Sequence, residues 1–210
     1  MGWDVAGMAT DVRDVVLTGV RKVYGDRTVL DDVSLTLAAG QTYCLMAPSG
    51  SGKTTLLRCL LGLEKVDGGS IEGIKQGRVS MMFQEDRLCE VLTPVENVAL
   101  VLPRDVRRSD VQGLLEQILP PDCMDRPAMQ LSGGMRRRVS LVRALAFPSD
   151  AIVLDEPFTG LDAGTRRTVI NFVLKYRAGR TLLVATHGED DARLLGAQTI
   201  DLVALQGCQG

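Results

Sequence analysis

Three features are missing from the 210-residue sequence, and each excludes a class of protein. No apolar run approaches the roughly 20 residues that a membrane-spanning helix needs, so a membrane role would require docking to another chain. Residues 1–13 lack the basic and then apolar layout of a signal peptide, and we expect a loose N-terminal segment there. The 5 cysteines include no Cys-x-x-Cys pair, which argues against a zinc site or a disulfide framework and fits a reducing cytoplasm.

A strong charge of one sign is also absent. The formal net charge is -2, whereas a protein that binds nucleic-acid phosphates is usually plainly basic, so we expect no nucleic-acid partner. The basic run at residues 136–138 is interpreted as a solvated helix face beside a nucleotide site. With 45% hydrophobic and 24% charged residues, the composition is that of a globular protein with one large domain or one domain carrying an insertion.

Hydrophobic patterns that indicate strands and helices alternate along most of the chain. Strands are predicted over residues 15–24, 33–37, 42–47, 78–83, 151–154, 181–186 and 198–205. Helices are predicted over residues 53–63, 132–147 and 164–178, with a short helix between the last two strands. This alternation predicts an α/β fold with a mostly parallel sheet flanked by helices on both faces. Ligands of such sheets bind beyond the carboxyl ends of the strands.

The stretch over residues 85–131 differs from the rest because it contains no strand candidate. Thr93 and Glu96 form a capping-box pattern around Pro94, which predicts the start of a helix. Ser109 is predicted to open a second helix in the same way. We therefore predict an inserted α-helical subdomain. The α/β core is then made of residues 14–84 and 132–210.

Residues 47–54 have the sequence Ala-Pro-Ser-Gly-Ser-Gly-Lys-Thr and lie between a predicted buried strand and a helix, as a phosphate-binding P-loop does. Glycines let the backbone N–H groups face phosphates, and the helix N-terminus adds a positive dipole end. Lys53 would reach the β- and γ-phosphates, and the Thr54 hydroxyl would bind Mg²⁺. The P-loop pattern begins with glycine where Ala47 stands, a change that costs little unless φ is positive. The other nucleotide-binding candidates in this loop are Ser49, Gly50, Ser51, Gly52 and Thr55.

Polar side chains follow three other apolar strands. Asp155 and Glu156 end one of them; Asp155 could hold Mg²⁺ through water, and Glu156 could act as the general base for an attacking water. Taken alone, this acidic pair fits a solvated loop equally well. His187, the single histidine, is predicted to contact a γ-phosphate at the same edge. Gln84 is an uncharged group that could touch Mg²⁺ or water and help catalysis.

A second candidate phosphate site lies at the start of the helix predicted from residue 132. Ser132 is a suitable N-cap, and Gly133 and Gly134 leave bare backbone N–H groups open to an anion. Glycine lowers helix stability by about 1 kcal/mol per interior residue, and a purely structural cap gains nothing from a second one. The pair of glycines therefore suggests that a phosphate approaches this helix.

Taken in order, these segments resemble the ABC (ATP-binding cassette) ATPase family over nearly the whole chain. Residues 131–135, Leu-Ser-Gly-Gly-Met, are similar to its signature sequence, with methionine where glutamine is common. Asp155 and Glu156 resemble the Walker B aspartate and the catalytic glutamate. Gln84 resembles the Q-loop residue, and His187 resembles the switch histidine.

The resemblance begins at Tyr24, which matches the aromatic residue that stacks on adenine, although a core tyrosine is an alternative. It implies a P-loop NTPase core, ATP and Mg²⁺ as cofactors, and ATP hydrolysis. It also implies that two cassettes, which we expect to be copies of one chain, face head to tail. Each ATP would lie between one P-loop and the other subunit's Ser132 and glycine N–H groups. Asp162, similar to the D-loop aspartate, would run along that interface.

A single cassette without membrane spans looks most like a bacterial subunit that powers solute transport through separate permease subunits. It would lie on the cytoplasmic face of the cell membrane and, in an importer, would work with an extracytoplasmic solute-binding protein. Residues 83–88 are similar to the nitrate, sulfonate and taurine importer group. One alternative is a cassette that signals to, or pulls on, a membrane complex without moving a solute. Another is a scaffold without turnover, against which the intact Lys53 and Glu156 argue.

Overall fold

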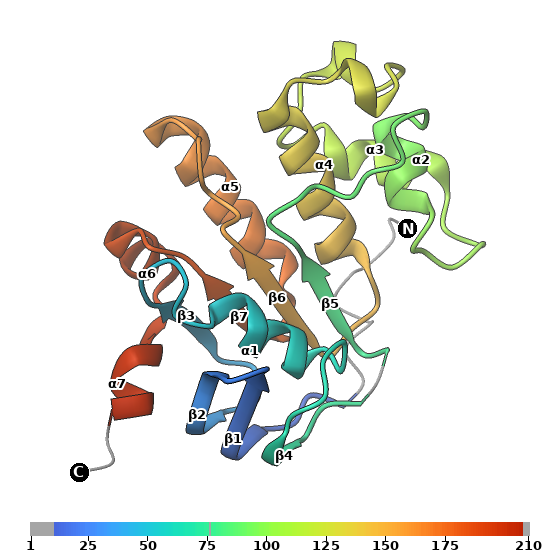
Figure 1. Cartoon of the computed structure of the whole chain (residues 1–210). Helices are drawn as coiled ribbons and strands as arrows, with labels where there is room; N and C mark the ends of the chain where they lie inside the picture. The colour runs from blue at the N-terminus through green and yellow to red at the C-terminus, as the bar shows by residue number, and fades with distance from the viewer. Residues whose placement is uncertain (1–10, 76, 208–210) are drawn as a thin grey trace.

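The computed structural model describes residues 11–75 and 77–207, so most of the predicted loose segment 1–13 lies outside the described part. A parallel sheet of five strands occupies the centre (Figure 1). Its order is β5 (Val79–Met82), β6 (Ala151–Asp155), β7 (Thr181–Ala185), β3 (Thr42–Met46) and β8 (Gln198–Asp201). A separate antiparallel sheet contains β2 (Arg27–Leu37), β1 (Val15–Tyr24) and β4 (Gly68–Glu72).

Helices cover both faces of the parallel sheet. They are α1 (Lys53–Leu60), α2 (Pro94–Ala99), α3 (Arg108–Leu115), α4 (Gly133–Ala146), α5 (Ala163–Tyr176), α6 (Glu189–Leu195) and α7 (Leu202–Gly207). Two short 3₁₀ helices, η2 (Pro121–Cys123) and η3 (Ala128–Gln130), precede α4. Within the described residues, none of these helices combines the length and the apolar composition needed to cross a membrane.

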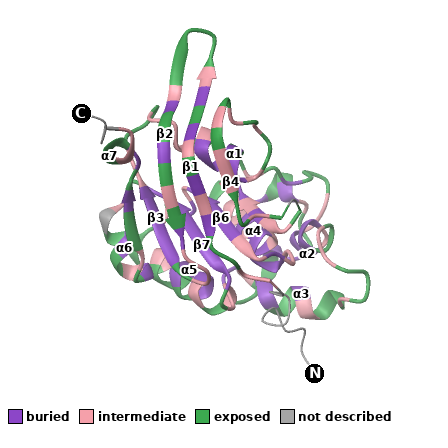
Figure 2. Ribbon diagram, turned by 90° about the horizontal axis from the view of Figure 1, so that it is seen from below, coloured by how far each residue is buried: buried purple, intermediate pink, exposed green. Residues whose placement is uncertain are grey.

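The parallel sheet separates two hydrophobic cores because successive side chains of a strand point to opposite faces. On β6, Ile152 and Leu154 belong to the core shared with α2 to α6, whereas Val153 belongs to the core shared with α1 and the antiparallel sheet. Strands β3 and β7 are buried almost throughout, which explains their continuous apolar sequences (Figure 2). The predicted α/β architecture is therefore present, with one additional sheet.

The sequence patterns predict the first strands but not the separate sheet that they form. Strands β1 and β2 pair with each other, and β1 pairs with β4, which the sequence patterns did not reveal. The reason is that β4 has the sequence Gly-Gly-Ser-Ile-Glu and contains a single large apolar residue. Gly69 has a φ of 74°, and a Cβ there would lie 2.3 Å from the carbonyl oxygens of Thr18 and Gly19. Close backbone approach therefore shapes this strand.

Helix starts in the stretch over residues 85–131 were predicted with mixed success. Thr93 caps α2 in the expected capping box with Glu96. Ser109 does not open α3, because the N-cap is Arg107 and makes no side-chain capping bond. This stretch packs on α4 and shares one core with it, and the boundaries predicted for a separate subdomain stay a prediction.

The predicted strand over residues 198–205 is too long. It ends at Asp201, whose carboxylate accepts hydrogen bonds from the N–H groups of Val203 and Ala204 at 2.9 and 3.2 Å. These bonds satisfy the first free N–H groups of α7, so the chain turns into a helix there.

Arg180 is fully buried between the C-terminal ends of α4 and α5. Its guanidinium donates to the carbonyls of Leu145, Phe147, Tyr176 and Arg177 at 2.6 to 3.0 Å. Burial lowers the pKa of Arg180 to about 10, so the side chain is still charged at neutral pH. A cation at the negative ends of two helices is favourable, and here it joins them.

We predict that Arg180→Ala lowers the free energy of unfolding by at least about 3 kcal/mol, because several buried carbonyls lose their donor at once. Urea denaturation checks this. The exposed Arg193, paired with Asp190 at 2.8 Å, provides the control, and Arg193→Ala should cost less than about 0.5 kcal/mol. Equal urea midpoints for the two variants would contradict the role of Arg180.

Candidate nucleotide-binding site

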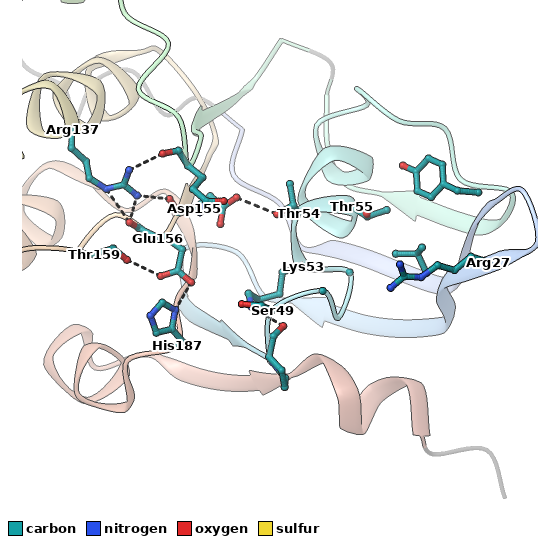
Figure 3. Close-up of a pocket in the computed structure, with 16 residues that line it drawn as sticks. Arg27, Ser49, Lys53, Thr54, Thr55, Arg137, Asp155, Glu156, Thr159 and His187 are labelled. Atoms are coloured by element: carbon teal, nitrogen blue, oxygen red, sulfur yellow. Dashed lines mark hydrogen bonds and ion pairs between the residues drawn. The ribbon is translucent and has the colours of Figure 1, made fainter. Parts of the chain in front are cut away.

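A cavity of about 650 Å³ lies beyond the carboxyl ends of β3, β6 and β7, beside the turn between β1 and β2 (Figure 3). The P-loop residues that line it are Ser49, Gly50, Gly52, Lys53, Thr54 and Thr55. Other predicted residues that line it are Tyr24, Gln84, Asp155, Glu156 and His187. Most of the predicted site thus comes together in one place.

The P-loop is built by left-handed glycines. Gly50 and Gly52 have φ angles of 80° and 98°, and a Cβ on Gly52 would lie 2.9 Å from the carbonyl oxygen of Val29. Both positions therefore need glycine. Ala47 does not have a positive φ, so its methyl group causes no backbone strain there. The departure from the P-loop pattern is thus compatible with the loop conformation.

The start of α1 is suited to an anion. Its N-cap, Gly52, provides no side-chain hydrogen bond, and the first turn carries no acidic residue. The first N–H groups therefore remain available, with the positive end of the helix dipole behind them. Lys53 lies over the same loop, where its ammonium donates to the carbonyls of Ala47 and of Pro48, the latter at 3.2 Å. The arrangement can hold the phosphates of a nucleotide.

Asp155 and Thr54 form the part of the site that could hold a cation. Their Oδ2 and Oγ1 atoms are 3.5 Å apart. Asp155 is 3% exposed, and this burial, together with the charge of Glu156, raises the pKa of its carboxyl group. The Lys53 ammonium and the bond to Thr54 act in the opposite direction. A divalent cation would relieve the repulsion between the two carboxylates, and hard cations prefer such oxygen ligands.

Glu156 has a left-handed backbone, with a φ of 51°, which costs a non-glycine residue about 1–3 kcal/mol. Its N–H donates to the carbonyl of Ala185 at 2.8 Å. One carboxylate oxygen lies 2.7 Å from Nδ1 of His187, and the other accepts from the Thr159 hydroxyl at 3.0 Å (Figure 3). The carboxylate is therefore fixed by two side chains and faces the cavity.

The ABC transporter family model matches residues 30–159, which is more than half of the chain. The chain belongs to the ABC transporter family. The predicted fold, ATP as the nucleotide, and the ATPase activity are thereby confirmed.

Curated relatives of this ABC cassette are aliphatic sulfonates import ATP-binding proteins. SsuB 1 of Nocardia farcinica is 40% identical over 93% of this chain and 80% of its own length. SsuB 2 of Burkholderia cenocepacia is 35% identical over 96% of this chain and 77% of its own length. Among solved structures, the dimeric post-hydrolysis state of the ATP-binding cassette MJ0796, bound to ADP and Pi, has a TM-score of 0.79. It is 29% identical and covers 89% of this chain and 93% of its own.

Tyr24 of this ABC cassette is 44% exposed at the end of β1, which excludes the alternative of a core tyrosine. The Lys22 ammonium lies 5.2 Å from its ring centroid. Gln84 also lines the cavity, and its carbonyl accepts from Arg137 at 2.8 Å.

Five predicted nucleotide-binding residues of the cassette do not line the cavity: Ser51, Ser132, Gly133, Gly134 and Asp162. Ser51 donates its hydroxyl to the Pro48 carbonyl at 2.7 Å. Ser132 caps α4 as predicted, and a Cβ on either following glycine would meet no atom within 4 Å. Asp162 caps α5 through the N–H groups of Gly164 and Thr165. Within one copy, the signature segment and the P-loop therefore stay apart.

The sequence patterns missed two residues that contact Glu156, namely Arg137 and Thr159. The interpretation of residues 136–138 as a helix face beside the nucleotide site agrees with Arg137, which lines the cavity. The face is not simply solvated, because all three arginines are half-buried and donate to backbone carbonyls of the protein. Helical periodicity offered a signal for Arg137, since Leu141 and Ala144 lie on the same side of α4 and are buried.

We predict that Asp155→Asn raises the melting temperature of the nucleotide-free, metal-free protein by a few degrees at about pH 8, because the variant lacks a buried carboxylate that burial disfavours. The gain should shrink as the pH falls below the folded-state pKa of Asp155, where the wild-type carboxyl is protonated, and vanish below the ordinary aspartate range. Thermal unfolding in a chelator checks this.

The control for this prediction is Asp162. The pKa of its carboxyl group is lowered because the carboxylate accepts hydrogen bonds from the Thr165 hydroxyl and from the N–H groups of Thr165 and Gly164. Its carboxylate therefore stabilises the fold above its unfolded-state pKa, and that contribution is lost as the pH falls through the folded-state value. Asp162→Asn should accordingly lower the melting temperature at about pH 8. An Asp155→Asn variant that also melts earlier would refute our account of Asp155.

Proposed function

We propose that this ABC cassette hydrolyses MgATP to power the import of sulfonates or similar small organic anions through separate membrane permease subunits. The observation that carries the proposal is the similarity to import ATP-binding proteins over more than 90% of this chain. The gathering of four proposed catalytic groups around one cavity supports it. Lys53, Asp155, Glu156 and His187 all line this cavity. A cassette with lost turnover would not need to keep these groups together.

In the proposed mechanism, the N-terminus of α1 and Lys53 bind the phosphates of ATP. Thr54 and Asp155, with Gln84 as a further ligand, would hold Mg²⁺, which would neutralise part of the phosphate charge. Glu156 accepts a proton from the attacking water. The water oxygen forms a bond to the γ-phosphorus while the bond between that phosphorus and the leaving ADP oxygen breaks. The imidazole of His187 lies against the Glu156 carboxylate and, we propose, contacts the γ-phosphate. Tyr24 stacks on the adenine.

A second copy of the chain completes the proposed site. Ser132, Gly133 and Gly134 are exposed, and a Cβ on either glycine would meet no atom within 4 Å. Ser132 and the N–H groups of the two glycines would bind the γ-phosphate of an ATP held by the partner's P-loop. Asp162, at the start of α5, would lie along the same interface. Each ATP then bridges two chains, and its hydrolysis separates them. Two solved structures of the cassette MJ0796, with TM-scores of 0.79 and 0.77, are both described as dimeric, which supports this arrangement.

The proposed permease contact lies on the stretch over residues 85–131. Three of the six large hydrophobic residues exposed in the described part of the chain are in this stretch, namely Val91, Leu100 and Met129. Met129 donates its N–H to the carbonyl of Glu90 at 3.0 Å, so it lies beside Val91. Val91 and Met129 thus form an exposed apolar pair, and such a pair supports a protein-binding surface there.

We predict that Glu156→Gln forms a stable ATP-bound dimer, because nucleotide still binds while proton transfer from water is lost. Size-exclusion chromatography with light scattering in excess MgATP should show about twice the 22.7 kDa mass of one chain. Lys53→Ala should remain monomeric because it no longer holds the phosphates. A monomeric Glu156→Gln protein under these conditions would count against the mechanism.

We predict that tagged Glu156→Gln protein, incubated with MgATP and detergent-solubilised membranes of its source organism, captures a multi-span permease and a sulfonate-binding protein. Mass spectrometry identifies the partners. A Met129→Asp variant of the same protein should lose the permease and keep its ATP-bound dimer, because the change lies outside the cavity. Recovery of single-span or soluble partners alone would exclude transport and favour a signalling cassette.

A further inference from the structure

The backbone of Glu156 is held by contacts on both sides. Its N–H donates to the Ala185 carbonyl at 2.8 Å, and its own carbonyl accepts from the Arg137 guanidinium, with Nε at 3.0 Å and Nη2 also in contact. A left-handed non-glycine residue persists only where its surroundings determine it strongly. The Glu156 carbonyl also accepts from the Thr159 N–H at 3.4 Å, within the turn that follows the strand. Arg137 provides the part of the support that comes from α4.

The same guanidinium binds two further carbonyls. Arg137 donates to the carbonyl of Asp155 at 3.1 Å (Figure 3). It also donates to the carbonyl of Gln84 at 2.8 Å. Gln84 follows β5, where the chain leaves the sheet for the stretch over residues 85–131. The planar guanidinium of Arg137 therefore links the backbone of Asp155 and Glu156 to the backbone of Gln84. Burial lowers the pKa of Arg137, while Asp86, Asp155 and Glu156 act in the opposite direction.

We propose that Arg137 is a positioning residue for ATP hydrolysis, which holds the Glu156 peptide in its left-handed conformation and ties it to α4 and to Gln84. The inference rests on the proposed role of Glu156 as the general base. Arg137 lies four residues after Gly133 on α4, about one helical turn from the exposed start of that helix. A phosphate that binds at this start therefore acts on the same rigid element that supports the Glu156 carbonyl.

Arg143 provides a matched control on the same helix. Its guanidinium donates to the carbonyls of Arg87 and Asp86 at 2.8 and 2.9 Å, and burial lowers its pKa as well. It thus anchors α4 to the loop that follows Gln84 and is not among the donors to Asp155 or Glu156. A comparison of variants at the two arginines therefore distinguishes the effect of anchoring the loop after Gln84 from the effect of positioning Glu156.

The first test measures steady-state ATP turnover, affinity for a fluorescent ATP analogue, and melting temperature of the full-length protein. Arg137→Ala should lower kcat by about 10- to 100-fold, the effect expected of a misplaced catalytic group. Nucleotide affinity and melting temperature should stay close to those of Arg143→Ala, which should keep near wild-type turnover. A loss of affinity as large as the loss of kcat, or an unchanged kcat, would overturn the proposal.

Two substitutions separate geometry from charge. Arg137→Gln keeps a planar donor and should recover part of the lost kcat, whereas Arg137→Lys keeps the charge without the planar fork and should stay close to Arg137→Ala. Full recovery by lysine would overturn the proposal, because charge alone would then explain the effect.

The last test combines Arg137→Ala with Glu156→Gln in single-turnover hydrolysis of γ-labelled ATP. If Arg137 acts through Glu156, the double variant should hydrolyse ATP no more slowly than Glu156→Gln alone. The reason is that the effects of two substitutions on residues that act together are not additive. A further loss of about tenfold would show that Arg137 acts independently and would refute the inference. Rapid turnover by Glu156→Gln itself would instead remove the general-base role, and with it the proposed mechanism.

Discussion

The register of three parallel strands determines the site. Ala185 on β7 pairs with Leu45 on β3 and with Asp155 on β6, so the three strands end side by side. The P-loop, Glu156 and His187 all follow within two residues of this line. Because hydrogen bonds also connect the Glu156 N–H to Ala185 and the Thr186 N–H to Leu45, the strand ends cannot separate without breaking the sheet. The catalytic groups are thus positioned by the most deeply buried part of the molecule.

This dependence on strand ends explains why much of the fold and site could be predicted from the sequence. An apolar strand followed at once by polar residues is visible in one dimension, and Asp155, Glu156 and His187 each have that context. Glycines with a positive φ in the P-loop are visible too. Strand β4 could not be predicted, because Gly69 owes its place to close contact with residues about fifty positions earlier. Such non-local pairing leaves no local pattern.

Arg137 was missed for a related reason. Its acceptors are backbone carbonyls, and every residue has one, so no residue type in the sequence marks the partners of an arginine that binds them. The same holds for Arg180, whose partners include four carbonyls at two helix ends. Basic residues on a helix therefore suggest a solvated face until the fold shows which of them are buried. In this protein, buried arginines connect elements that the hydrophobic pattern treats as independent.

The site opposes stability in two ways, and binding of a nucleotide with a cation would relieve the first of them. Asp155 is buried next to Glu156, so ionisation of both carboxyl groups is unfavourable without a cation. Glu156 also carries a left-handed backbone that only its neighbours maintain. Both unfavourable contributions come from residues at the end of β6, the strand that contributes side chains to both hydrophobic cores. Binding of ATP and a cation at this edge would lower the first cost by neutralising the carboxylates, so ligand binding should stabilise the native state.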